Sequence, residues 1–199
     1  FGSTPLMVIL TAIGSALLAE FLFNTLFSKN TRSLGDGSAI VTALLLSCTI
    51  GSFTPLHIVA IGAAIAVIFG KLLWGGLGRN RFNPALTGRE FMVVLFPAVM
   101  NSGEIWKNED LINISQIIIF DNKYYDHLIF NPMGAMGEYS PLLLILGGVF
   151  LLWRRRISWH IPASILISFS FMLLVLRTWQ PIGFTLGGLL LGSIFIATD

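Results

Sequence analysis

Residues 74 to 90 concentrate the side chains that could bind a flat ligand. Asn80 and Asn83 present amide donors and acceptors three residues apart, and such amides can read a ring edge that carries carbonyl and N–H groups. Phe82 and Trp74 could stack on that ring, and Gly78 lets the backbone approach it closely. A flavin isoalloxazine fits this description, and a quinone head group fits it in part. The alternative is a structural turn whose asparagines cap helix ends.

Ionisable side chains also lie within or beside apolar runs, at Glu20, Lys71 and Arg89. Such groups are costly in a membrane and usually face a cavity, a partner or the protein interior. Glu20, the deepest, either pairs with a basic group or lies on an ion pathway. Lys71 and Arg89 are near a boundary, where long cationic side chains can also snorkel to the interface. No residues have the spacing of a nucleophile and its base or of metal ligands, so we predict neither a catalytic residue nor a metal site.

The composition points to lipid as the surrounding solvent. The chain is 55% hydrophobic and 11% charged, whereas a soluble domain carries about 25% charged residues. Its mean hydropathy is +0.82. The single cysteine, Cys48, excludes a disulfide framework or a cysteine-ligated cluster within this chain. No basic run is interleaved with exposed aromatic residues, so no nucleic-acid partner is expected.

Apolar segments separated by polar turns predict an all-α, polytopic membrane protein. A spanning helix needs about 20 apolar residues, and the candidates are 5–27, 38–52, 55–74, 84–100, 140–153, 160–176 and 184–197. We expect a single integral membrane domain, with a first repeat region at 1–100, an outer polar loop at 101–139 and part of a second repeat at 140–199. Lysine and arginine place the loop at 75–83 in the cytoplasm, because cytoplasmic loops carry an excess of these residues.

Two of these segments, 38–52 and 184–197, are short and rich in small residues. Paired short, glycine-interrupted segments are typical of an internal repeat with a binding site at its interface. The alternative is a pair of ordinary helices whose small residues allow close packing.

Several motifs together resemble the NqrB/RnfD family, the flavin-carrying membrane subunits of sodium-pumping NADH:quinone oxidoreductase (Nqr) and of ferredoxin:NAD oxidoreductase (Rnf) complexes. The matching stretches occur in family order and cover most of the chain: 36–38 with 42–44, 69–71 through 75–80, 82–86 through 96–98, 134–140, 159–162 and 192–199. The resemblance implies about ten spans in two inverted halves. Only seven candidate segments are found here, and the family's last motif normally continues beyond the aspartate. The chain is therefore expected to be truncated or to lack loops.

The same resemblance implies a function. It implies an electron-transfer subunit in a bacterial cytoplasmic membrane, which relays electrons through flavin and couples this to Na⁺ or H⁺ translocation. Its partners would be the other membrane and peripheral subunits of the complex, the lipid bilayer and, by the same resemblance, a quinone. A riboflavin or FMN is implied near residues 80–84, which makes Asn80 and Asn83 the best ligands, with Phe82 and Gly78 beside them.

One family feature is missing. The family usually carries FMN on a threonine of the outer loop, yet residues 101–139 contain no threonine. Either the site is lost, or the residues that bear it are absent from this sequence, so we predict a non-covalent flavin in this chain and name no attachment residue. Two other functions stay open from the sequence: a solute channel or transporter with an inverted repeat, and a redox-silent scaffold subunit of such a complex. A flavin absorption band or solute uptake would separate them.

Overall fold

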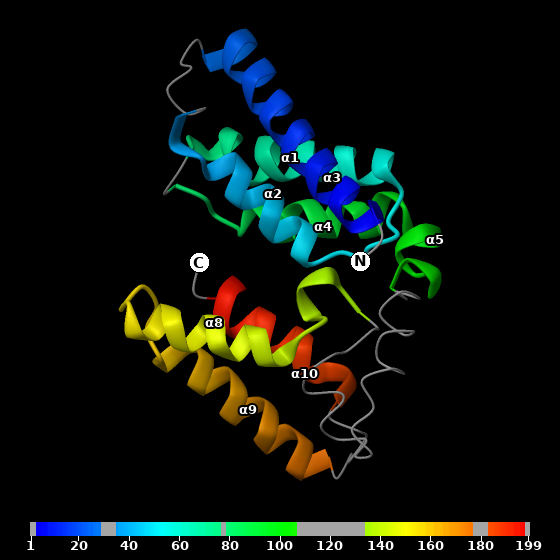
Figure 1. Ribbon diagram of the computed structural model, residues 1–199. Coiled ribbons are helices and arrows are strands. Elements are labelled where there is room, and N and C mark those ends of the chain that lie inside the picture. Colours follow the sequence, from blue (N-terminus) through cyan, green and yellow to red (C-terminus); the bar gives the residue numbers. More distant parts are fainter. Residues whose placement is uncertain (1–2, 29–34, 77–78, 107–133, 177–182, 198–199) are drawn as a thin grey trace. The chain divides into compact units, whose positions relative to one another are not determined.

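The computed structural model describes residues 3–28, 35–76, 79–106, 134–176 and 183–197, and these residues fold into helices joined by turns (Figure 1). No β-strand occurs in the described ranges, so the predicted all-α class is confirmed. The chain divides into two compact units, residues 1–108 and 109–199.

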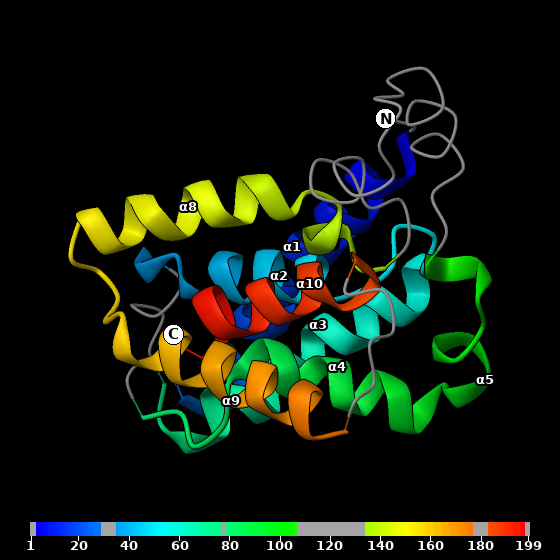
Figure 2. The ribbon, with the colours of Figure 1, turned by 90° about the horizontal axis from the view of Figure 1, so that it is seen from below.

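The first unit is a bundle in which α3 occupies the central position. Its elements are α1 (Ser3–Phe23) with a π-helical extension η1 (Asn24–Ser28), α2 (Ser38–Cys48), α3 (Leu56–Gly70) with a 3₁₀ turn η3 (Leu72–Trp74), α4 (Pro84–Leu95), α5 (Pro97–Met100) and η4 (Glu104–Trp106). Helix α3 packs against α1, α2 and α4, as Figures 1 and 2 show. A helix surrounded in this way needs small residues on several faces, and Gly62, Ala63, Ala66 and Gly70 are all buried.

Glycines bring α3 and α4 into backbone contact. A Cβ atom at Gly88 would lie 2.6 Å from the Gly62 carbonyl oxygen, and one at Gly62 would lie 2.2 Å from the Met92 sulfur. A Cβ atom at Gly70 would lie 2.5 Å from the Pro84 Cα. The two helices therefore touch along their length through positions that only glycine can occupy without a shift.

In the described residues of the second unit, 134–176 and 183–197, three helices and a short turn are present. Its elements are η5 (Met136–Glu138), α8 (Pro141–Trp153), α9 (His160–Leu176), and α10 (Gly183–Leu190) with a π-helical extension η6 (Leu191–Ile196). The segment α10–η6 packs against α8, and its extension also packs against α9. Close approach again depends on glycine, because a Cβ atom at Gly148 of α8 would lie 2.9 Å from Ile194.

Each predicted apolar segment contains a described helix. Two of the segments differ from the prediction, one in where its helix ends and the other by an interruption. The segment predicted at 38–52 is helical only to Cys48, because the Thr49 and Thr54 hydroxyls donate to the carbonyls of Leu46 and Gly51 and stabilise a turn. The segment predicted at 84–100 is interrupted at Phe96, where Pro97 starts a new helix. The number of spans and the inverted repeat remain predictions.

Among the residues that the structure describes, two helices are long and apolar enough to cross a membrane by length and composition, Ser3–Phe27 and Leu56–Trp74. The other apolar helices are shorter. Large apolar side chains are exposed along the outer faces, for example Leu143 (67%) on α8 and Ile167 (69%) on α9. A soluble monomeric protein rarely exposes so much contiguous apolar surface, so these faces are suited to contact with lipid or with neighbouring subunits.

Candidate functional site

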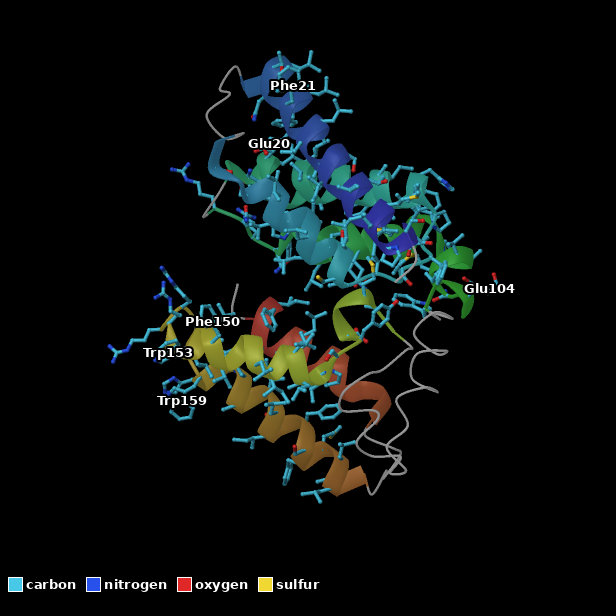
Figure 3. All side chains as sticks on the ribbon, in the orientation of Figure 1. Glu20, Phe21, Glu104, Phe150, Trp153 and Trp159 are labelled. Atoms are coloured by element: carbon cyan, nitrogen blue, oxygen red, sulfur yellow. The ribbon has the colours of Figure 1, made fainter. Side chains whose placement is uncertain are left out.

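A buried ion pair joins α1 to the end of α3. The Lys71 Nζ lies 2.5 Å from the Glu20 Oε1, and both side chains are only 1% exposed. Glu20 is on the inner face of α1, near the π-helical extension, as Figure 3 indicates. Lys71 follows the last residue of α3. The Lys71 side chain therefore points into the protein and does not snorkel, and the basic partner that the sequence allowed for Glu20 is Lys71.

The start of α2 completes this cluster. The Lys71 ammonium also donates to the Ser38 hydroxyl, and it lies 3.7 Å from Asp36 Oδ1. Gly37 adopts a left-handed conformation (φ 72°), which turns the chain so that Asp36 accepts a hydrogen bond from the Ser38 N–H at 2.8 Å. We call Glu20, Asp36, Ser38 and Lys71 the Lys71 cluster.

Asp36 lies in a 3₁₀ turn of the connection between α1 and α2, outside the α-helices, and its pKa is lowered from 3.8. Partial burial acts to raise the pKa, but the hydrogen bonds from Ser38 and the positive charge of Lys71 outweigh it. Asp36 is consequently ionised at neutral pH. The Lys71 cluster thus contains a second carboxylate beside the Glu20–Lys71 pair, and two carboxylates around one ammonium are an arrangement that attracts a further cation.

Asn24 adds a polar group near the cluster. It lies one helical turn beyond Glu20, is 2% exposed and belongs to the π-helical extension of α1. Residues four apart on a helix share a face. Its side-chain nitrogen meets no hydrogen-bond acceptor within the described residues. Short π-helical segments occur frequently at functional sites, so this end of α1 is a candidate part of the functional site.

The residues predicted to bind a flavin lie at the start of α4, and they do not share one environment. Asn80 is exposed and Phe82 is 65% exposed, so both are accessible to a ligand. The Asn83 side chain accepts a hydrogen bond from the Leu86 N–H at 3.2 Å and caps α4. Gly78 lies outside the described residues. The capping role considered for asparagine therefore holds for Asn83, while flavin contact stays a prediction.

An aromatic–cation contact borders this loop. The Arg81 guanidinium lies over the Trp74 ring, 4.6 Å from its centroid, and the Trp74 indole N–H donates to the Phe69 carbonyl at 2.8 Å. One face of Trp74 is therefore occupied, which leaves Phe82 as the more accessible ring for stacking. The described residues thus fit a flavin in part, through the Asn80 amide and the Phe82 ring.

Sequence reasoning overlooked Asp36, Ser38 and Arg81 as members of these sites. The signal for the first two was a polar Asp-Gly-Ser sequence directly before an apolar helix. Nothing local to the sequence indicates that this turn meets Lys71, since the turn precedes α2 and Lys71 follows α3.

The chain matches the family described as NQR2, RnfD, RnfE along residues 1–199. It is 32% identical to a subunit of the proton-translocating ferredoxin:NAD(+) oxidoreductase complex of Clostridium ljungdahlii, over the whole chain and 67% of that protein. It is 30% identical to a subunit of the ion-translocating oxidoreductase complex of Sodalis glossinidius, and 31% identical to the corresponding protein of Escherichia coli (strain SMS-3-5 / SECEC). Each of these two alignments covers the whole chain and 71% of the relative.

Proposed function

This chain belongs to the NQR2, RnfD, RnfE family, and we propose that it is a membrane-integral subunit of an Rnf-type, redox-driven ion pump in a bacterial cytoplasmic membrane. The observation that carries the proposal is similarity along the whole chain to subunits of ion-translocating oxidoreductase complexes. The fold supports it, since the chain combines membrane-length helices with a buried ionic cluster. Other subunits of such a complex would be its partners.

The proposed redox role is a flavin relay. A bound riboflavin or FMN would supply the capacity to accept and release electrons singly or in pairs. The exposed Phe82 would stack on its ring system and the Asn80 amide would hydrogen-bond the ring edge. Flavin binding would be non-covalent, because the outer loop offers no threonine. A quinone as electron acceptor remains a further prediction.

Visible absorption of the purified complex tests the relay. We expect Asn80→Ala and Phe82→Ala to reduce the flavin content and the electron-transfer rate without loss of subunits. Asn83→Asp is the matched variant at the position that caps α4. Aspartate keeps the side-chain oxygen that accepts from the Leu86 N–H, but it has no amide N–H to donate to a ligand. Unchanged flavin content in all three variants would exclude this loop as a flavin site. A complex without flavin and with solute uptake in liposomes would favour the channel instead.

We further propose that the Lys71 cluster lies on the path of the coupling ion, Na⁺ or H⁺. Its carboxylates come from α1 and from the turn before α2, and they converge on one ammonium in a largely buried position. An ionisable group inside a membrane protein commonly marks such a path. Movement of Lys71 away from Glu20 would expose a carboxylate that prefers to bind another cation.

The ion-path proposal is tested with Glu20→Gln in the reconstituted complex. Electron transfer should continue at a reduced degree of coupling, so that fewer ions are moved per electron. Subunit content serves as the control, because Glu20 also holds helices together. Full coupling in an intact complex would show that Glu20 has only a structural role.

A further inference from the structure

The turn between α8 and α9 gathers exposed cationic and aromatic side chains. Arg154, Arg155 and Arg156 are all exposed, Trp153 before them is 78% exposed, and Trp159 after them is 62% exposed. Figure 3 shows the two tryptophans together at this end of the helices. The Trp159 ring stacks on His160 at a centroid distance of 4.2 Å, which orients it at the start of α9. We call residues 153–160 the arginine turn.

The backbone of the arginine turn is strained. The N–H groups of Arg154, Arg155 and Arg156 donate to carbonyls of the last turn of α8 at 2.9, 2.9 and 3.0 Å. Hydrogen bonds in this pattern require one residue at the helix end with a left-handed backbone conformation, and Arg155 adopts it with φ 53°. Glycine is the usual residue at such a position. Among the described residues Arg155 is the only non-glycine with positive φ, so an arginine occupies a position where glycine would relieve strain.

The three guanidinium groups have no carboxylate partner within the described part of the chain, where the ion pairs are those of Lys71. The adjoining helices expose apolar side chains, including Val149 (57%) and Phe150 (55%) on α8. From the helices to the turn the surface therefore changes from apolar side chains, through tryptophan, to arginine. A bilayer has the matching order of acyl chains, interfacial region and phosphates.

We propose that the arginine turn binds the phosphate groups of anionic phospholipids, with phosphatidylglycerol-type head groups as the ligand class. Guanidinium binds phosphate through paired N–H groups, and tryptophan is the side chain most suited to the head-group level. An acidic surface of a neighbouring protein would also complement the charge. The lipid is favoured because the exposed residues on both flanking helices are apolar and the tryptophans lie between them and the charges.

Native mass spectrometry of the detergent-solubilised complex tests the proposal, with phosphatidylglycerol and phosphatidylcholine of identical acyl chains as probes. The wild-type complex should bind phosphatidylglycerol more tightly. Replacing all three arginines with glutamine should weaken phosphatidylglycerol binding by about 100-fold, since each basic residue contributes about fivefold near an anionic lipid surface. Replacement of all three by lysine is the matched control, and it should retain affinity within about fivefold because the charges remain.

Arg155→Gly separates binding from folding. Glycine accepts the left-handed conformation, so the melting temperature should stay the same or rise, while phosphatidylglycerol affinity should fall about fivefold. The proposal is overturned if the wild type does not discriminate between the two lipids, or if the glutamine or Arg155→Gly variant binds phosphatidylglycerol as tightly as the wild type. It is equally overturned if the lysine variant loses as much affinity as the glutamine variant. Loss of a neighbouring protein from the glutamine variant, without lipid preference in the wild type, would assign the turn to a protein interface.

Discussion

Lys71 and Glu20 are 51 positions apart in the sequence, yet their charged atoms lie 2.5 Å from each other. Helices α1 and α3 are brought together by small residues such as Ala12, Ala16 and Gly62, all of which are buried. The ion pair can form because the backbones approach closely enough for both side chains to be withdrawn from lipid. The ion pair therefore depends on the packing of the bundle, and it also contributes to that packing.

Removing one partner of this pair should destabilise the protein more than removing both. Glu20→Gln or Lys71→Met leaves a buried charge without its main counter-ion, which typically costs about 3–5 kcal/mol. The double variant leaves no buried ammonium and should recover a large part of that loss. Thermal unfolding of the four proteins in detergent gives the coupling energy of the cycle. Additive losses would show that the two groups do not stabilise each other.

Gly88→Ala on α4 should destabilise the bundle, because the added Cβ atom would meet the Gly62 carbonyl oxygen at 2.6 Å. Overpacking of this kind costs about 1–3 kcal/mol. Gly14→Ala on α1 is the matched control, since a Cβ atom there has no neighbour within 4 Å. Within a helix that exchange should raise stability by about 0.5–1 kcal/mol. Equal melting temperatures for the two variants would contradict the close approach of α3 and α4.

Stability should fall in acid partly through Asp36. Because its folded-state pKa is below 3.8, its ionised form stabilises the native state above that pH. This contribution is lost as the pH falls through the lowered pKa. Asp36→Asn should therefore unfold more easily than the wild type at neutral pH, and the difference should shrink below about pH 4. Melting curves from pH 3 to 7 measure it, and a difference that is independent of pH would be the contrary result.

The cap of α4 should be measurable apart from any ligand. Asn83→Ala removes the acceptor for the Leu86 N–H and should cost about 1 kcal/mol. Asn83→Asp preserves an acceptor and should cost little. Thermal unfolding of flavin-free protein compares the two, and similar losses for both would mean that the hydrogen bond does not stabilise the helix.

Local patterns in the sequence predict the helices well and their contacts poorly. Pro84 at the first position after an asparagine predicts the start of α4, and apolar runs predict the other helices. The early end of α2 depends on hydroxyl groups that bond to the preceding turn, a local competition that hydrophobicity alone does not reveal. The Lys71 cluster could not be assembled from sequence, because hydrophobic periodicity gives no information on which helix faces meet. Likewise, the left-handed Arg155 occupies a position where the sequence shows no glycine.

The contact between Gly70 and Pro84 brings the two candidate sites, the Lys71 cluster and the loop before α4, close together in space. Gly70 directly precedes Lys71, and Pro84 directly follows Asn83, at the end of the loop that carries Asn80 and Phe82. Since the Pro84 Cα would lie 2.5 Å from a Cβ atom at Gly70, neither residue can shift toward the other without displacing it. If this loop holds the flavin proposed above, a displacement of the loop would press directly on Gly70, the residue before Lys71. In that case the close packing of the end of α3 against the start of α4 would couple the proposed flavin loop mechanically to the buried Lys71 ammonium.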